Sequence, residues 1–404
     1  MIGPTSTEAE NWAYRADVAE QAIRDRHAAS LWSLPRTNLG VVSWPAPARD
    51  KFFLTWHYWW QAHYVDCLVD AYVRLPSKAK GRGVADAVRG IRLRNLGPLS
   101  ANRYYDDRAW MALALLRIQE QQGRRRPNRT LRRLIDALTA GIDADLGVLP
   151  WREGDLFFNV PANGPAAILL ARLGRLDEAV AMVDWVFANL VDSRGLIMDG
   201  IRLSMGGEET VRTIYSYNQG VMIGACLELA LALEDRGESE AATRQLTRVH
   251  QLVHAVATHL ATPKAVIAGG GSGDGGLFDG ILVRYLAQAA MRLPQDDRMS
   301  RATRRICRRL VLHSAEAAWQ HRLEVDGLPL FPGDWNADAV FPRGGGFVAK
   351  PSGAAAAAER CLSVQLSGWM LMEAAAAVSA DSVRAEGDAR RGPEEGDPAA
   401  TREP

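Results

Sequence analysis

The spacing of apolar residues is the feature that most constrains the fold of this chain. Between its ends, apolar residues recur at i, i+3, i+4 and i+7, and very few segments alternate as strands do. About twelve such segments, each near the usual helical length, are separated by turns. The pattern predicts an all-helical chain, with helices near 8–30, 51–75, 82–94, 104–122, 128–143, 159–173, 175–192, 214–235, 238–261, 276–293, 297–323 and 356–378.

Successive segments differ in polarity. The second, fourth, sixth, eighth and tenth open with polar and aromatic clusters and then turn apolar and small, whereas the odd segments carry Arg and Glu faces, as in RATRRICRRL. A helix that is apolar nearly all round is buried, and one with a broad charged face covers the outside. This order predicts six hairpins closed in a ring, an (α/α)6 barrel whose inner helices all start at one end. An open superhelix of hairpins is the alternative, although no fixed-period repeat is present.

Length and composition bound the domain organisation and the partners. The chain has 404 residues, 48% of them hydrophobic, and we expect residues 8–378 to form the barrel. Residues 1–7 are expected to be flexible and residues 379–404 to be a disordered tail, because the tail has almost no large apolar residues. A net charge of +1 gives no basic field for nucleic acid.

Targeting signals and cysteines are equally uninformative in this sequence. No apolar run reaches the roughly 20 residues of a membrane span, and no secretory signal is recognisable, so we expect a cytoplasmic protein. We also expect the protein to act as a monomer. Cys67, Cys226, Cys307 and Cys361 lie far apart without metal-ligand spacing, and we expect free thiols and no metal site. Lysine occurs at only five positions while Arg and Ala abound, which indicates a G+C-rich bacterial genome.

Asp106 and Asp107 stand side by side in NRYYDDRAW, ahead of a strongly apolar run. Inside a helix, neighbouring side chains point about 100° apart, but at a first turn both can face one substrate. Free N–H groups and the helix dipole stabilise at least one carboxylate there. Ordinary capping explains a single Asp equally well. The aromatic surroundings favour a sugar site, because sugar C–H faces stack on rings and hydroxyls seek charged acceptors.

Candidate substrate-binding residues come mainly from the starts of the expected inner helices. Each has an alternative: the tryptophans can be core packing, the amides and Asp274 can be helix caps, and His57, like His63, can be a core histidine. No cofactor is expected. The candidates are Trp56, His57, Trp59, Trp60, Tyr104, Tyr105, Trp151, Asn159, Asn218, Gln219 and Asp274.

Five motifs together resemble glycoside hydrolase family 76 over roughly residues 10–378. They are WHYWWQAHYVDCLVDAY, NRYYDDRAWMALALL, NGPAAILLARLG, YSYNQGVMIGACLELA and GDGGLFDGILVRYLA. The resemblance implies an (α/α)6 barrel and an endo-acting α-1,6-mannanase with a retaining mechanism, in which Asp106 is the nucleophile and Asp107 the general acid/base. The chain departs from the family at Phe278-Asp279-Gly280, where the family usually has Phe-Lys-Gly.

Three functions from different classes remain open at this stage. The first is cleavage or transfer of α-1,6-linked mannose chains, such as the backbone of actinobacterial lipoglycans. It suits the pair, since retaining hydrolysis needs two carboxyl groups about 5–5.5 Å apart, and repulsion favours one shared proton. The second is a sugar-binding barrel without catalysis. The third is a magnesium-dependent isoprenoid-type enzyme, which needs a further carboxylate where this chain has Trp110.

Overall fold

The computed structural model describes residues 6–124, 126–342 and 357–391, with side chains through residue 385. Within these residues, twelve long helices follow the order that the apolar spacing predicts, and the largest shifts of helix ends are at the start of α3 and the end of α13. They are α1 (Ser6–Arg26), α3 (Tyr58–Arg74), α4 (Lys78–Arg94), α5 (Tyr105–Gln121), α6 (Arg129–Thr139), α7 (Val160–Arg172), α8 (Leu176–Asn189), α9 (Ser216–Asp235), α10 (Ser239–His259), α11 (Phe278–Arg292), α12 (Arg298–Gln320) and α13 (Leu362–Arg391). A short helix, α2 (Ala48–Lys51), precedes α3.

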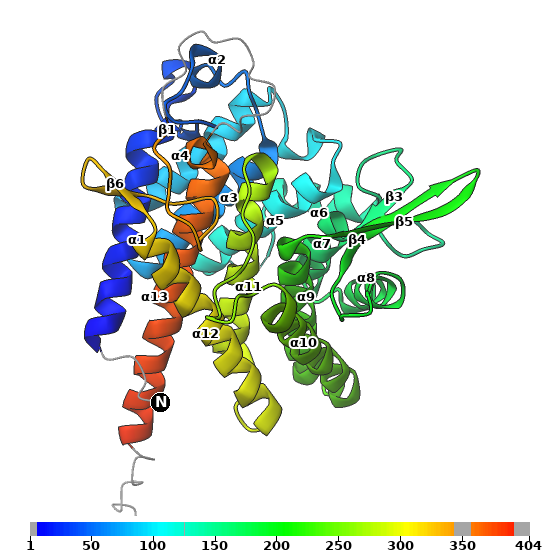
Figure 1. Cartoon of the computed structure of the whole chain (residues 1–404). Coiled ribbons are helices and arrows are strands. Elements are labelled where there is room, and N and C mark those ends of the chain that lie inside the picture. The colour runs from blue at the N-terminus through cyan, green and yellow to red at the C-terminus, as the bar shows by residue number, and fades with distance from the viewer. Residues whose placement is uncertain (1–5, 125, 343–356, 392–404) are drawn as a thin grey trace, which may run out of the picture.

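The contacts between the long helices arrange them in two concentric rings. Figure 1 shows these helices from the side. In the inner ring α3, α5, α7, α9, α11 and α13 pack side by side in that order, and α13 contacts α3 to close it. In the outer ring α4, α6, α8, α10, α12 and α1 each pack on inner neighbours. The inner and outer order expected from polarity is therefore confirmed, and the fold is an (α/α)6 barrel.

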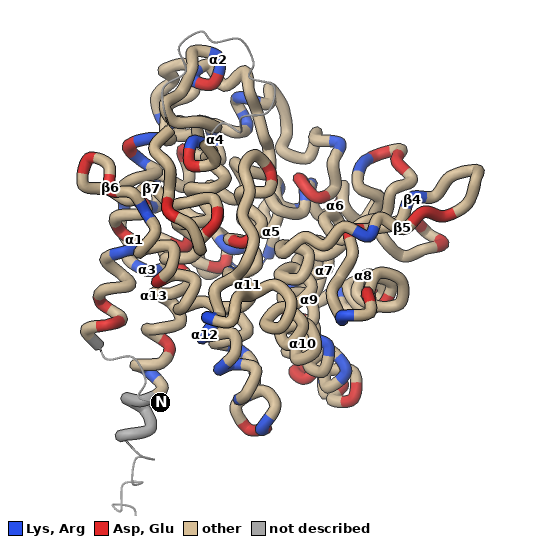
Figure 2. The backbone as a smooth tube through the Cα atoms, in the orientation of Figure 1, with Lys and Arg blue, Asp and Glu red and all other residues tan. Residues whose placement is uncertain are grey.

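Burial separates the two rings. In α9 every residue from Tyr217 to Ala230 is buried, whereas α6 buries one face only, formed by Leu131, Leu134, Ile135 and Leu138. Figure 2 shows the same contrast as charge: Lys, Arg, Asp and Glu crowd α10 and α12 and are sparse along α7 and α9. Because charged side chains stay in water unless paired, this pattern fixes which helices line the barrel.

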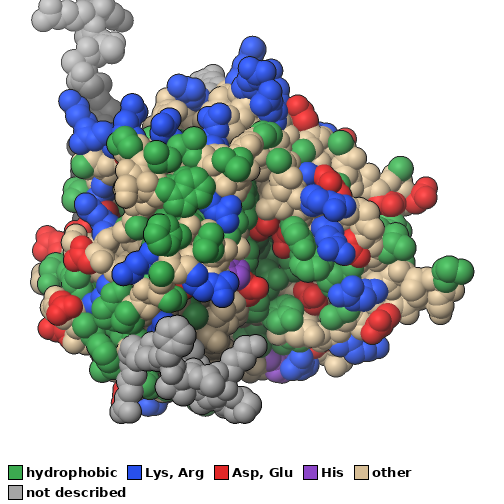
Figure 3. All heavy atoms as spheres, turned by 90° about the horizontal axis from the view of Figure 1, so that it is seen from above, with side chains coloured by type: hydrophobic (Ala, Val, Ile, Leu, Met, Phe, Trp, Pro, Cys, Tyr) green, Lys and Arg blue, Asp and Glu red, His purple; other side chains and the backbone are tan. Residues whose placement is uncertain are grey.

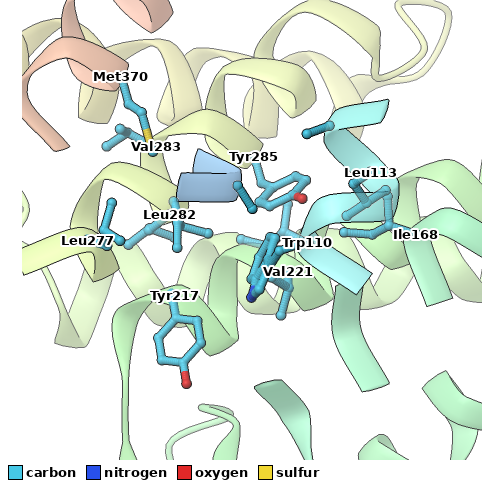
Figure 4. Close-up of a cluster of buried hydrophobic side chains, with 14 of the residues drawn as sticks. Trp110, Leu113, Ile168, Tyr217, Val221, Leu277, Leu282, Val283, Tyr285 and Met370 are labelled. Atoms are coloured by element: carbon cyan, nitrogen blue, oxygen red, sulfur yellow. The ribbon is translucent and has the colours of Figure 1, made fainter. Parts of the chain in front are cut away.

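The inner helices meet in one apolar core. Figure 4 shows side chains from α5, α9 and α11, among them Trp110, Val221 and Leu282, filling the space between the helices. Gly220 allows α9 to approach α11 closely, since a Cβ at this position would lie 2.7 Å from the Leu282 Cα atom. A side chain there would push the two inner helices apart.

Short strands join the helices at the end where the inner helices begin. β3 (Phe157–Asn159), β4 (Met198–Ser204) and β5 (Gly207–Ile214) form an antiparallel sheet in that order, and β4–β5 is a hairpin that projects from the barrel (Figure 1). Two smaller pairs are β1 (Ala28–Ala29) with β2 (Leu39–Gly40) and β6 (Leu323–Val325) with β7 (Leu328–Leu330). The apolar spacing predicted no strand here, although Gly206-Gly207 between two alternating stretches is a hairpin signal.

The C-terminal boundary differs from the prediction. α13 continues through Arg391, so disorder does not begin at residue 379. The stretch after Ser379 keeps the Ala, Arg and Glu residues that favour helices, even though it has few large apolar ones. Residues 1–5 and 392–404 of the two ends expected to be flexible lie outside the described residues, and Ser6 and Thr7 already belong to α1.

Two smaller expectations can be compared with the structure. All four cysteines are free; Cys67, Cys226 and Cys307 are buried and Cys361 is half-buried. Of the helices in the described part of the chain, none has the length and apolar character that a membrane span requires.

Candidate active site

Asp106 and Asp107 lie in the first turn of α5, with Tyr104 as the N-cap residue. The backbone N–H of Asp107 donates to Asp106 Oδ1 at 2.9 Å, and the indole Nε1–H of Trp151 donates to Asp106 Oδ2 at 3.0 Å. Trp151 reaches the pair because its backbone oxygen accepts from the Tyr105 N–H at 2.9 Å, which ties its loop to the start of α5. Asp107 Oδ2 accepts from Asn102 Nδ2 at 2.6 Å.

The two carboxyl groups lie in different electrostatic environments. Burial raises the pKa of Asp106 to about 6, while hydrogen bonds from the Asp107 amide and from Trp151 oppose the rise. Burial also raises the pKa of Asp107 well above its usual range, and repulsion from Asp106 adds to it. The charge of each carboxylate opposes ionisation of the other, so the pair favours a single proton, and the more strongly raised pKa of Asp107 favours Asp107 as its carrier.

Asp274 joins this site from the other side of the ring. It lies in a 3-10 turn, η3 (Gly273–Leu277), just before α11, and its Oδ1 accepts from the indole N–H groups of Trp59 at 3.1 Å and Trp60 at 2.9 Å. Its charge also raises the pKa of Asp106 and Asp107. The starts of α3, α5 and α11 thus converge, as the barrel predicts.

Aromatic rings flank the carboxylates. His57, the N-cap residue of α3, stacks on Trp60 with ring centroids 4.2 Å apart. Tyr104 packs edge-on to Trp151 at 5.0 Å, beside Asp106. A second group on α9 and α11 stacks Tyr217 on Phe278 at 4.3 Å. Neither Phe278 nor Tyr217 was a candidate from the sequence, although both sit in the clusters that open the inner helices.

Four of the predicted substrate-binding residues make contacts within the fold. Trp56 lies under Arg94, with the guanidinium carbon 4.9 Å from the ring centroid. Tyr105 is buried and packs against Gly141, so closely that a Cβ atom added to Gly141 would lie within 2.4 Å of the Tyr105 ring. The Asn159 side chain caps α7, and the Gln219 amide is used by the backbone of Ile197 and Tyr215. Asn159 Oδ1 and both polar atoms of the Gln219 amide thus serve the fold.

Asp199 on β4 is a site residue that sequence reasoning missed. Asn218 Nδ2 donates to its Oδ1 at 3.2 Å, and burial raises the pKa of Asp199 to about 6. The fully buried Asn218 has its Oδ1 without a partner among the described residues. Burial raises the pKa of the Tyr217 hydroxyl, and the charges of Asp199, Asp106 and Asp274 add to the rise. In Figure 4 this hydroxyl points away from the apolar cluster.

Asp279, where the resemblance leads one to expect a cation, adds a further carboxylate at the start of α11. Its Oδ1 accepts from Ser216 Oγ at 2.6 Å, and burial raises its pKa to about 6, with a contribution from Asp334. The end of the barrel seen in Figure 3 is hollowed near its middle, where acidic, apolar and histidine side chains gather. The hollow is therefore acidic and aromatic, a combination suited to polyhydroxylated ligands.

The donors around the pair bear on metal binding. Trp151 and Asn102 present N–H groups to Asp106 and Asp107, on oxygens that a metal ion would need as ligands. Within residues 6–124, 126–342 and 357–391, no group of three or more His, Cys, Asp or Glu side chains is placed to hold a metal ion.

Comparison with known proteins places these observations in context. Residues 18–339 match the model of Glycosyl hydrolase family 76. No curated protein sequence matches the chain. Similar solved structures include the GH76A α-1,6-mannanase from Salegentibacter sp. HEL1_6, at TM-score 0.74 and 27% identity, over 91% of this chain and 99% of that one.

Two further structures are similar over nearly their whole length. One is an inactive variant of the same mannanase, with two aspartates replaced by asparagine, in complex with α-1,6-mannotriose; it has TM-score 0.74 and 26% identity, over 91% of this chain and 99% of that one. The other is the Lin0763 protein from Listeria innocua, with TM-score 0.73 and 25% identity, over 90% of this chain and 97% of that one.

Proposed function

This chain is a glycosidase that belongs to glycosyl hydrolase family 76, and we propose that it hydrolyses α-1,6-mannosidic bonds with retention of configuration. Asp106 is the nucleophile and Asp107 the general acid/base. The observation that carries the proposal is the unequal environment of two adjacent carboxyl groups. Asp106 accepts N–H hydrogen bonds on both of its oxygens, whereas burial and repulsion from Asp106 raise the pKa of Asp107 more strongly, against the hydrogen bond from Asn102.

The chemistry follows from these two states. The ionised Asp106 attacks the anomeric carbon while Asp107 gives its proton to the departing glycosidic oxygen, so the C–O bond breaks without releasing an alkoxide. Asp107 is then a carboxylate and takes a proton from water, which attacks the same carbon and frees Asp106. The partial burial of both groups keeps them close to one substrate carbon and away from bulk solvent.

The substrate class is inferred from the site and from similarity. Tyr104 and Trp151 on one side, and Tyr217 and Phe278 on another, offer ring faces, while Asp199 and Asp274 offer acceptors for hydroxyl groups. The similar mannanase binds α-1,6-mannotriose. An α-1,6-mannose oligosaccharide or polysaccharide is accordingly the proposed substrate. That its natural form is the backbone of actinobacterial lipoglycans stays a prediction.

Product stereochemistry tests the proposal directly. The enzyme is incubated with linear α-1,6-mannotetraose, and proton NMR follows the anomeric signals during the first minutes. Two successive inversions at one carbon give an α product, before mutarotation mixes the anomers. A β product, or no cleavage at all, would contradict the proposal. Products longer than the substrate would identify transglycosylation beside hydrolysis, and a lipoglycan substrate in parallel would test the natural source.

The pair also predicts a bell-shaped pH profile. The value of kcat/KM should fall about tenfold per pH unit below pH about 6, because Asp106 is protonated as the pH drops through its pKa. It should fall again on the alkaline side, where Asp107 loses its raised-pKa proton. Initial rates at low substrate concentration across the pH range measure both limbs. Full activity at pH 4 would show that the nucleophile is not Asp106 in this environment.

A further inference from the structure

Asn102, which lies three residues before the first turn of α5, contacts the acid/base and is not accounted for by the mechanism above. Its Nδ2 atom is 2.6 Å from Asp107 Oδ2, and its Oδ1 atom accepts from the Tyr104 backbone N–H at 2.9 Å. The second contact is a turn in which an Asn side chain bonds the backbone two residues on. It fixes the orientation of the amide, because only the oxygen can accept from an N–H group.

The fixed amide restricts the proton of Asp107. An NH2 group can donate and cannot accept, so Asp107 Oδ2 must present a lone pair to Asn102. The carbonyl oxygen of a protonated carboxyl group is a better acceptor than its hydroxyl oxygen, so this contact favours the proton of Asp107 on Oδ1. Asp106 is held in the opposite state, since both of its oxygens face N–H donors, the Asp107 amide and the Trp151 indole. The side chain of Trp151 thus donates to Asp106, and the side chain of Asn102 donates to Asp107.

We propose that Asn102 is a positioning residue that directs the catalytic proton to Oδ1 of Asp107, while Trp151 keeps Asp106 deprotonated. This inference rests on the proposed function, since it assigns roles within the same reaction. In the first step the proton moves from Asp107 Oδ1 to the glycosidic oxygen as the bond to carbon breaks. In the second step the same oxygen accepts a proton from the attacking water, so the enzyme returns to its starting state.

The test uses two variants of Asn102 that keep the turn. Asn102→Ser retains an oxygen for the Tyr104 N–H but is too short to reach Asp107, and Asn102→Asp retains the acceptor and replaces the donor by a carboxylate. With α-1,6-mannotriose, kcat/KM should fall about tenfold to 100-fold in both. Loss of the donor should move the alkaline limb of the pH profile upward, more in Asn102→Asp, since an added negative charge opposes ionisation of Asp107.

Leaving-group dependence separates positioning from simple structural damage. The substrates are aryl α-mannosides or aryl α-1,6-mannobiosides with different leaving groups. The loss of kcat/KM in both Asn102 variants should disappear for the 2,4-dinitrophenyl glycoside, because 2,4-dinitrophenolate departs without protonation. Trp151→Phe provides the matched contrast: it removes a donor from the nucleophile, so its defect should persist for every leaving group and its acid limb should move upward. An equal loss on all leaving groups with an unchanged alkaline limb in the Asn102 variants would overturn the inference.

A second readout does not depend on turnover. Carboxyl ¹³C NMR titration should show a higher pKa for Asp107 in Asn102→Ser than in the wild-type enzyme, and an equal or lower pKa would also overturn the inference. If the wild-type enzyme cleaves neither mannotriose nor aryl glycosides, the proposed function fails. If it cleaves them and the Asn102 variants lack these signatures, only the positioning role fails.

Discussion

Asp106→Asn and Asp107→Asn are each expected to lower kcat/KM for α-1,6-mannotriose at least about 1,000-fold while leaving the fold intact. Asparagine has nearly the shape of aspartate, so only ionisation chemistry is lost. The first replacement removes the proposed nucleophile and the second removes the proposed proton donor. Because both act in one mechanism, the double variant should be little worse than either single one. Steady-state kinetics and circular dichroism measure the two quantities.

The roles of the pair can be separated with azide. In Asp107→Ala, azide should restore turnover of an activated aryl α-mannoside and give the α-mannosyl azide, because the nucleophile still works. In Asp106→Ala it should give the β-mannosyl azide by a single inversion. Asp145→Asn, at an exposed position after α6, is the matched control and should keep wild-type kinetics. Near-native turnover in either Asn variant of the pair would refute the catalytic assignment.

Arg284→Met is expected to cost about 3–5 kcal/mol in the free energy of unfolding. Arg284 on α11 crosses the barrel interior to α3, with Nη1 3.0 Å from Asp66 Oδ2 and Nη2 2.7 Å from Asp70 Oδ2. Arg117 on α5 pairs with the same two carboxylates. Removing Arg284 leaves two buried anions with one cation, which is the costly case for a buried ion pair. Denaturant unfolding monitored by circular dichroism measures the change.

The pH dependence of that loss provides a check. Burial alone would raise the pKa of Asp66, but the charges of Arg117 and Arg284 outweigh it and lower the pKa to about 2. Because the pKa of Asp66 is lower in the folded protein than the value of about 4 in the unfolded chain, its ionisation stabilises the folded state above about pH 4. This contribution is lost as the pH falls toward about 2. The difference between wild type and Arg284→Met should therefore shrink over that range. Arg309→Met, at an exposed position on α12, should change stability by less than about 0.5 kcal/mol.

A loss below 1 kcal/mol in Arg284→Met, or a loss that does not depend on pH, would contradict a stabilising role for this cross-barrel network. Asp66 and Arg284 lie near the middle of α3 and α11, and Arg117 lies near the end of α5, whereas the aspartate pair lies at the start of α5. Activity per folded molecule should therefore change little. Measuring kcat on the folded fraction would separate the two effects.

Helix positions and the inner and outer order were accessible from the sequence because both are local properties. A helix shows its buried face through a period of 3.6 residues, so α9 reads as apolar all round and α6 as one-sided without reference to any partner. The NRYYDD stretch likewise combines an Asn turn, a helix start and two first-turn carboxylates within six residues. The aspartate pair at the centre of the site could therefore be recognised from the sequence, and the family resemblance suggested its chemistry.

Contacts between distant segments were decided by the tertiary structure alone. The Trp151 donor to Asp106 is 45 residues away in the chain, and Asp274 is more than 200 residues from Trp59 and Trp60. Asp199 stands on β4, whose first four residues are all buried, and its partner β5 is largely exposed, so burial does not alternate along either strand. Apolar period says which face of a helix is buried, but only the closed ring sets how each inner helix is turned about its axis. That rotation sends Gln219 to the backbone and Asn218 to Asp199.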